Sequence, residues 1–263
     1  MGRTFLVTGA SSGIGEAVAR RLAAEPGSRL ILVARREDRL RALAEELPAP
    51  ASWVATDLTE ADAPERVAAH VEERGEGLHL LVNNAGASWR GRFGDAGWEN
   101  VKRTMELNFD AVVRLTEALL PALRASAPSA IVNVASTAGR ISRPGAGAYS
   151  ASKYALIGWS DALHAEERES GVHVGLVMPG FIATEGFPAE ELRARFWTRR
   201  LVSTPQKAAE AVVDAGLRGR AERYVPRPYG LVAVLRILAP GLVRRVISGG
   251  AGGAMTTATR PGE

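Results

Sequence analysis

The sequence of 263 residues contains no cysteine. Disulfide bonds, thiolate metal sites and cysteine nucleophiles are therefore excluded, and the absence agrees with a reducing cytosol. No stretch reaches the roughly 18 apolar residues expected of a transmembrane helix. The first predicted strand begins almost at Met1, so we expect no signal peptide and a cytoplasmic protein.

Lysine and aromatic residues are also scarce. Three lysines stand against thirty arginines, aromatic residues make up 6% of the chain, and the formal net charge is +4. Nucleic-acid binding needs a basic stripe with aromatic side chains, whereas these arginines are dispersed, so no nucleic-acid partner is expected. The four histidines lack the spacing of metal ligands, and no metal site is predicted.

What the sequence does contain is a regular alternation of apolar strands and helices. Strands are predicted at residues 3–8, 29–34, 52–55, 78–82, 130–134 and 172–178, with a last edge strand at 223–225. Apolar strands separated by helices indicate a parallel sheet covered on both faces. We expect one α/β catalytic domain over residues 1–248, a doubly wound parallel sheet, with a substrate-loop insertion near 185–200 and a disordered tail at 249–263.

Two long helices are expected in the middle of the chain. One covers about residues 98–123, and Pro121 is expected to disturb its end because proline cannot donate the helical hydrogen bond. The other covers residues 149–170 and is ended by Gly171.

The segment 230–247 is apolar and basic, with Arg236, Arg244 and Arg245 among its leucines and valines. A segment of this kind can lie on a membrane surface. It can equally cover a substrate cleft or an oligomer interface, and the sequence leaves these three roles open.

A glycine-rich turn, TGASSGIG at residues 8–15, joins the first strand to the first helix. Glycine lets the backbone approach a pyrophosphate, and the helix N-terminus supplies N–H donors. The spacing G-x-x-x-G-x-G differs from the G-x-G-x-x-G fingerprint of dinucleotide sites, but the position in the first strand–turn–helix unit is the same. A cofactor site is therefore predicted at Gly9, Ser11, Ser12, Gly13, Ile14 and Gly15.

Two arginines follow the second strand and indicate the cofactor. An acid at this place binds a ribose 2′-hydroxyl, whereas arginine accommodates a 2′-phosphate. NADP(H) is therefore favoured over NAD(H), with Arg35 as the first candidate because it directly follows the strand. Arg36 either shares this role, faces solvent or pairs with a carboxylate. After the third strand, Asp57 and Leu58 are expected at the adenine, unless Asp57 caps the next helix.

The fourth strand ends in a turn that contains Asn84, Ala85 and Gly86. Small residues and amides at the carboxyl end of a strand suit the crevice where cofactors lie. These three residues are predicted to contact the cofactor, with a simple turn as the alternative. Trp89, just beyond, is expected either to touch substrate or to pack.

Tyr149 and Lys153 carry the predicted chemistry. Side chains four residues apart share one helix face, and a nearby ammonium lowers the pKa of a phenol from its usual value of ~10. Ser136 can hold a carbonyl or alcohol oxygen beside the phenol, so the set is a candidate acid/base device. Four tyrosines and three lysines give only about 0.05 such pairs by accident.

Together these motifs resemble the short-chain dehydrogenases/reductases over about residues 3–185, in the order found in that family. The motifs are the glycine turn, the turn after the fourth strand, Asn108, Ser136, Tyr149-x-x-x-Lys153 and Pro179-Gly180. The resemblance implies a Rossmann-like sheet of about seven parallel strands and NAD(P)H-dependent oxidoreductase activity. It also implies a homodimer or homotetramer, often assembled through the two long helices.

The resemblance also implies roles for single residues. Tyr149 would be the general acid/base, Ser136 would position the substrate oxygen, and Lys153 would lower the tyrosine pKa and bind the nicotinamide ribose. Asn108 would hold a water in the proton relay, unless it is a plain polar residue in a helix. The stretch expected to contact the nicotinamide carboxamide contains Pro179, Gly180, Ile182 and Thr184.

We therefore predict an NADP(H)-dependent oxidoreductase that interconverts a carbonyl and a secondary alcohol on a hydrophobic small molecule. An epimerase or dehydratase on the same scaffold is one alternative. A non-catalytic NADP(H)-binding regulator is another, although a regulator would not need the acid/base set.

Overall fold

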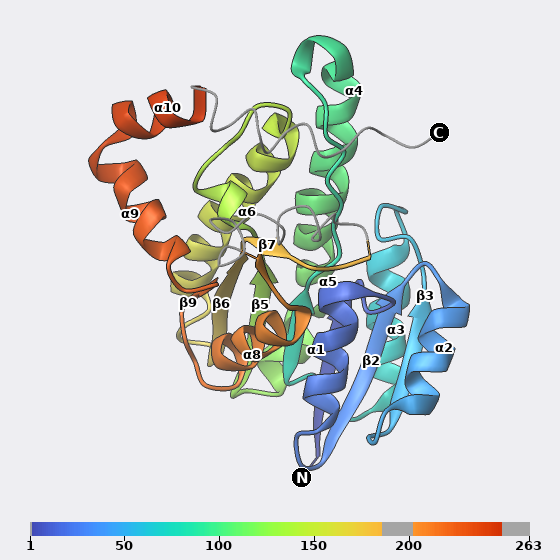
Figure 1. The fold of residues 1–263 in the computed structure, drawn as a ribbon. Coiled ribbons are helices and arrows are strands. Elements are labelled where there is room, and N and C mark those ends of the chain that lie inside the picture. Colours follow the sequence, from blue (N-terminus) through green and yellow to red (C-terminus); the bar gives the residue numbers. More distant parts are fainter. Residues whose placement is uncertain (1, 186–201, 249–263) are drawn as a thin grey trace.

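The computed structural model describes residues 2–185 and 202–248. The predicted substrate-loop insertion, apart from Glu185, and the predicted tail lie outside the described residues. The described part forms one α/β unit around a seven-stranded sheet (Figure 1).

The seven strands are all parallel, as predicted. Their order is β3-β2-β1-β4-β5-β6-β9. The chain starts in the middle, winds outward to β3 and returns to the other side of β1 with β4. The strands are β1 (Arg3–Thr8), β2 (Ser28–Ala34), β3 (Ala51–Ala55), β4 (Leu80–Asn83), β5 (Ser129–Val134), β6 (Val172–Pro179) and β9 (Glu222–Val225).

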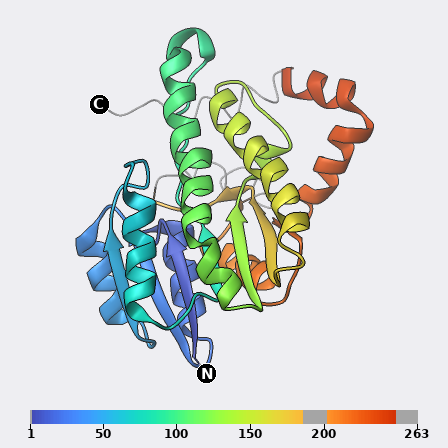
Figure 2. The ribbon, with the colours of Figure 1, turned by 180° about the vertical axis from the view of Figure 1, so that it is seen from behind.

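Helices cover both faces of this sheet (Figures 1 and 2). One face carries α1 (Gly13–Ala23), α2 (Glu37–Glu46) and α8 (Pro205–Gly216). The other face carries α3 (Ala63–Arg74), α5 (Ala111–Ala125) and α6 (Gly147–Glu166).

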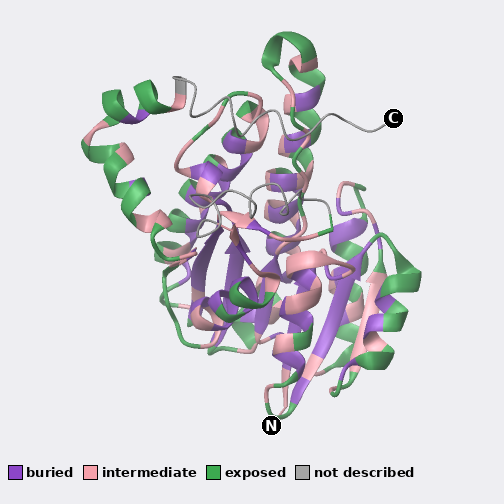
Figure 3. Ribbon diagram, in the orientation of Figure 1, coloured by how far each residue is buried: buried purple, intermediate pink, exposed green. Residues whose placement is uncertain are grey.

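Strand β1 shows why the strands are apolar throughout. Phe5 and Val7 pack in the cluster of α1, α2 and α8, whereas Leu6 points the opposite way into the cluster of α3, α5 and α6. All three side chains are completely buried, and Figure 3 colours most of the central strands as buried. Burial of such a side chain stabilises the fold by about 1.5–3 kcal/mol, so both faces of the sheet contribute to the core.

The helix predicted over residues 98–123 is confirmed in its start, because a kink at Gly97 divides α4 (Phe93–Met105) and the long helix follows this kink. Its continuity as one α-helix is wrong, because it passes through one π-helical turn, η1 (Glu106–Asp110), before it continues as α5. Gly97, with φ of 59°, interrupts α4 near its start. A π-turn is not visible in apolar periodicity, because it shifts the register by a single residue.

The predicted effect of Pro121 is also wrong, because α5 continues through it to Ala125. The helix predicted over residues 149–170 is α6, which begins two residues earlier and ends at Glu166. Gly171, with φ of 73°, lies in the turn that leads into β6 rather than at the end of the helix.

Beyond β6, a small parallel sheet pairs β7 (Phe181–Ile182) with β8 (Val202–Ser203). The predicted edge strand at 223–225 is confirmed as β9. The apolar segment that follows forms two helices, α9 (Tyr229–Leu238) and α10 (Pro240–Ser248). Among the described residues, no helix is long and apolar enough to cross a membrane.

Candidate active site

The carboxyl ends of the central strands border a cavity of about 570 Å³. It lies where the strand order reverses between β1 and β4, which is the place where open α/β sheets bind ligands. Every predicted cofactor residue except Gly15 lines the cavity. The predicted catalytic residues Ser136, Tyr149 and Lys153 also line it, whereas Asn108 does not. The fold therefore brings the glycine turn and the three residues Ser136, Tyr149 and Lys153 to one cavity.

The glycine turn is shaped for a close approach of backbone to ligand. Gly9 and Gly13 have φ values of 66° and 60°, a region that favours glycine. Ser12 is the N-cap of α1 but makes no side-chain capping hydrogen bond. The first N–H groups of α1 are thus not held by this hydroxyl, and an N-terminus of this kind fits the pyrophosphate of a dinucleotide.

Gly15 has a packing role instead. A Cβ at this position would lie 2.1 Å from the carbonyl oxygen of Gly9, so α1 packs directly on the turn. The hydroxyl of Thr8 accepts the N–H groups of Asn84 (2.9 Å) and Ala85 (3.0 Å). The amide of Asn84 donates to the carbonyl of Thr8 (3.0 Å). These bonds join the glycine turn to the end of β4.

The two arginines after β2 have different partners. Arg36 donates from Nη2 to the hydroxyls of Ser11 (3.0 Å) and Ser12 (2.9 Å). Arg35 lies with Nη1 3.6 Å from Oδ2 of Asp57, and its side chain is 74% exposed. Neighbouring residues of an extended chain point to opposite sides, so only one of them reaches the glycine turn. The carboxylate pairing considered for Arg36 is found at Arg35, and Arg36 is the arginine at the turn.

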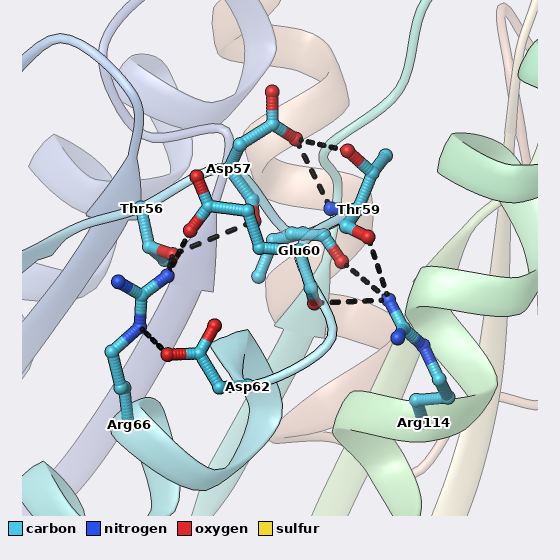
Figure 4. A network of polar contacts seen from close by, with 8 residues as sticks. Thr56, Asp57, Thr59, Glu60, Asp62, Arg66 and Arg114 are labelled. Atoms are coloured by element: carbon cyan, nitrogen blue, oxygen red, sulfur yellow. Dashed lines mark hydrogen bonds and ion pairs between the residues drawn. The ribbon is translucent and has the colours of Figure 1, made fainter.

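Asp57 closes a turn after β3 (Figure 4). Its Oδ1 accepts the N–H (3.0 Å) and the hydroxyl (2.9 Å) of Thr59. Burial acts to raise the pKa of Asp57, but these hydrogen bonds and Arg35 outweigh it and hold the pKa below its ordinary value. The alternative that Asp57 caps the next helix is wrong, because the N-cap of α3 is Asp62.

Two arginines hold the same turn from outside (Figure 4). Arg114 on α5 donates to the carbonyls of Leu58 (3.0 Å) and Thr59 (3.3 Å). Arg66 on α3 donates to the hydroxyl of Thr56 (2.6 Å). This network fixes the backbone at Leu58, a residue that lines the cavity on the side expected for the adenine.

Ser136 is positioned by the short 3-10 helix η2 (Thr137–Gly139) that follows β5. Its Oγ accepts the N–H of Ala138 (3.1 Å) and donates to the carbonyl of Pro179 (3.3 Å). A Cβ on Gly139 would lie 2.8 Å from the carbonyl oxygen of Lys153, so η2 packs directly on α6. This packing holds Ser136 against the helix that carries the tyrosine and the lysine.

Tyr149 does not have the pKa that the sequence suggested. Burial raises the pKa of the phenol above its ordinary value, while a hydrogen bond with Ser136 and the charges of Arg143 and Arg90 act to lower it. The ammonium of Lys153 lies 5.8 Å from the centroid of the tyrosine ring. The two side chains share a helix face as predicted, but at this distance the lysine does not overcome the effect of burial.

Lys153 is itself buried, with 4% of its surface exposed. Its Nζ donates to the carbonyl of Val134 (2.9 Å). Burial lowers the pKa of the amine to about 8. A Cβ on Gly86 would lie 3.6 Å from Nζ, so the absence of a side chain at Gly86 keeps the space beside the amine open.

Asn108 lies on the π-turn η1 and is completely buried. Its Oδ1 accepts the N–H of Ala87 (2.9 Å), and its Nδ2 donates to the carbonyl of Ala87 (2.9 Å) and to Ser152 Oγ (3.1 Å). Both polar atoms of the amide have partners, so Asn108 clamps the loop after β4 to α6. The role in a proton relay that the resemblance implies stays a prediction.

One positive charge beside Tyr149 was not predicted from the sequence. It belongs to Arg143. The guanidinium of Arg143 lies 4.7 Å from the ring centroid of Phe181, and the signal that could have found it is its place between Ser136 and Tyr149 in the sequence. Tyr229 was also missed: a Cβ on Gly180 would lie 2.4 Å from its ring. The charge of Arg143 therefore acts on Tyr149, and its guanidinium lies against an aromatic ring.

Packing, one of the two roles left open for Trp89, is confirmed, and its contact with substrate stays a prediction. Trp89 lines the cavity, and its indole packs against Arg103, whose guanidinium lies 4.8 Å from the ring centroid. Its carbonyl accepts a hydrogen bond from Asn100 Nδ2 (3.1 Å).

Comparison with known proteins agrees with this geometry. The family described as short chain dehydrogenase matches residues 3–193. Dehydrogenase/reductase SDR family member 7B of Bos taurus is 32% identical over 92% of this chain and 79% of its own length. The putative oxidoreductase SadH of Mycobacterium tuberculosis (strain CDC 1551 / Oshkosh) is 31% identical over 95% of both chains.

A solved structure is similar over most of the chain. It is a variant of actinorhodin polyketide ketoreductase with NADPH, which superimposes with a TM-score of 0.78 at 31% identity, over 87% of this chain and 97% of the other. The family match includes the glycine turn and α6. The chain therefore belongs to the short-chain dehydrogenase/reductase family, whose members are oxidoreductases that use a nicotinamide cofactor.

Proposed function

We propose that this enzyme is an NADP(H)-dependent carbonyl reductase or alcohol dehydrogenase for an apolar small molecule. The observation that carries the proposal is the convergence of the glycine turn, Arg36 and the set Ser136, Tyr149 and Lys153 on one cavity. A regulator without activity would have no need of a serine, a phenol and an amine packed together at the end of β5 and the start of α6.

Each group in the cavity has a place in hydride-transfer chemistry. When bound, the nicotinamide gives or accepts the hydride. The glycine turn and the N-terminus of α1 hold the pyrophosphate, and Lys153 donates to the nicotinamide ribose. Ser136 and Tyr149 donate hydrogen bonds to the substrate oxygen, where negative charge grows during reduction. Tyr149 then transfers its proton to that oxygen, with the reverse transfer in oxidation.

Arg36 supports NADP(H) as the cofactor. Its guanidinium lies against Ser11 and Ser12 at the rim of the glycine turn, and no acid directly follows β2 to hold a ribose 2′-hydroxyl, since the next two residues are arginines. Together with the two hydroxyls it forms a set of donors that suits a 2′-phosphate.

The proposal is tested by following cofactor consumption with a panel of ketones. We expect NADPH to be oxidised faster than NADH, and apolar aliphatic, aromatic or steroid ketones to react faster than small polar ones. The panel should include acyl-thioester ketones, and secondary alcohols should be tested with NADP⁺. Tight NADPH binding without turnover of any compound, or product formation without net consumption of NADPH, would contradict the proposal.

Replacing Arg36 by alanine is expected to raise the KM for NADPH on the order of 10- to 100-fold, because a charge-assisted hydrogen bond to a phosphate contributes about 1.5–3 kcal/mol. The KM for NADH should change little. Arg35→Ala is the matched control, since it removes the same side chain one residue away and leaves Arg36 at the glycine turn. A larger loss of NADPH affinity in Arg35→Ala than in Arg36→Ala would contradict this assignment and identify Arg35 as the residue that binds the 2′-phosphate.

A further inference from the structure

Helices α9 and α10, here called the C-terminal arm, project beyond the layers that enclose the sheet (Figures 1 and 2). The arm follows β9 at the edge of the sheet. Its first residue, Tyr229, packs its ring against Gly180. The arm is therefore anchored beside the active-site cavity, while most of its length extends away from the core.

Most of the arm is exposed (Figure 3), and much of the surface that it exposes is apolar. Of the large apolar side chains that the described structure exposes, most lie in the arm: Leu231, Val232, Val234, Leu235, Ile237, Leu238, Leu242 and Val246. Three of them are exposed by about three quarters, namely Leu231 (75%), Ile237 (74%) and Leu238 (77%). Exposed apolar side chains concentrated in one short segment mark an interaction site.

The charge of the arm has one sign. No aspartate or glutamate occurs between residues 223 and 262, whereas Arg227, Arg236, Arg244 and Arg245 fall in or directly before the arm. Arg227, Arg244 and Arg245 are exposed. Apolar side chains flanked by arginines, without any acid, are complementary to a surface that is apolar inside and negatively charged outside.

We propose that the C-terminal arm docks this enzyme on an anionic lipid surface. The leucine, isoleucine and valine side chains enter the boundary between headgroups and acyl chains, and the guanidinium groups pair with lipid phosphates. Long arginine side chains can reach the headgroups while their stems stay in the apolar layer. The contact is peripheral, because none of the described helices is long and apolar enough to span a bilayer.

A second copy of the chain is a poorer occupant of this surface. A two-fold symmetric contact places the same patch against itself. Two arms would then bring their arginines together with no carboxylate from either arm to neutralise them. An anionic bilayer covers the same apolar side chains and supplies the missing negative charge.

The test is cosedimentation of the purified full chain with vesicles of phosphatidylcholine, with or without phosphatidylglycerol. We expect binding to the anionic vesicles that weakens in high salt, because salt screens exposed charges. The double variant Ile237→Asn/Leu238→Asn should lower the partition coefficient about tenfold or more. Arg244→Gln/Arg245→Gln should lower it by about 30-fold on anionic vesicles.

The matched control is Arg74→Gln/Arg168→Gln. It removes the same charge from exposed residues at the other end of the sheet, before β4 and β6, and should bind as the parent does. Equal binding by the arm variants and the parent, or no binding to either kind of vesicle, would overturn the proposal. The proposal would also be overturned if light scattering showed that the parent is an oligomer and that Ile237→Asn/Leu238→Asn is a folded monomer, because the arm would then be a contact between copies.

None of these results depends on ketone reduction. The vesicle experiments therefore test the docking surface independently of the proposed function.

Discussion

Replacing Tyr149 by phenylalanine is expected to lower kcat by 10³-fold or more while leaving NADPH binding nearly unchanged. The substitution removes the hydroxyl that transfers the proton, a step that contributes about 10²- to 10⁴-fold. It also removes a hydrogen bond to the oxygen on which charge develops, worth a further factor on the order of 10². The ring and its packing remain. Initial rates and a fluorescence titration with NADPH measure the two effects separately.

Tyr154→Phe is the matched control, because it makes the same chemical change on the same helix. The hydroxyl of Tyr154 bonds to the carbonyl of Arg140, and its side chain is 40% exposed, outside the cavity lining. We expect this variant to keep the activity of the parent. Comparable activity in Tyr149→Phe and the parent would end the assignment of Tyr149 as the acid/base group.

Replacing Lys153 by methionine is expected to change how stability depends on pH. In the folded protein burial lowers the pKa of this amine from 10.5 to about 8, so between these pH values the unfolded chain binds more protons than the folded one. Stability of the parent therefore rises as the pH increases from 8 to 10.5. Each pKa unit corresponds to about 1.4 kcal/mol, so the gain is about 3 kcal/mol. The variant lacks this gain.

Urea unfolding of both proteins at pH 7.5, 9 and 10 measures the effect. The difference in free energy of unfolding, parent minus variant, should increase steadily with pH, whatever its value at pH 7.5. This readout does not depend on the cost of leaving the carbonyl of Val134 without its donor, because that cost is the same at each pH. Lys207→Met, which changes an exposed lysine on α8, is the matched control. A difference for Lys153→Met that is flat over this range would show that the amine is not buried as described.

The fold could be predicted because its determinants are local. Each strand is a short apolar run, and alternating helices leave a parallel, doubly covered sheet as the arrangement that buries them. Strand β1 was predicted at its observed bounds, and β9 within one residue. The π-turn inside the long helix before β5 was not predicted. Asn108 on this turn bonds to Ala87 and Ser152, which are contacts between distant parts of the sequence.

The sequence predicted which residues form the candidate site better than it predicted their charge environment and pKa values. Glycine spacing and the four-residue separation of Tyr149 and Lys153 are properties of one turn and one helix face, so sequence sufficed. Which of Arg35 and Arg36 reaches the glycine turn depends on the direction of each side chain at the end of β2. The pKa of Tyr149 depends on burial and on the charges of Arg90 and Arg143, which loops far apart in the sequence bring near it.

By itself, the sequence determined the doubly wound architecture, the family and the residues gathered at the cavity, because apolar runs, turn glycines and helix faces act over a few residues. Only the tertiary structure decided that Gly15 packs against the glycine turn, that Asn108 clamps a loop, that Arg36 faces the glycine turn and that most of the C-terminal arm extends away from the core. These outcomes depend on distances and burial between segments far apart in the chain, which no local pattern specifies.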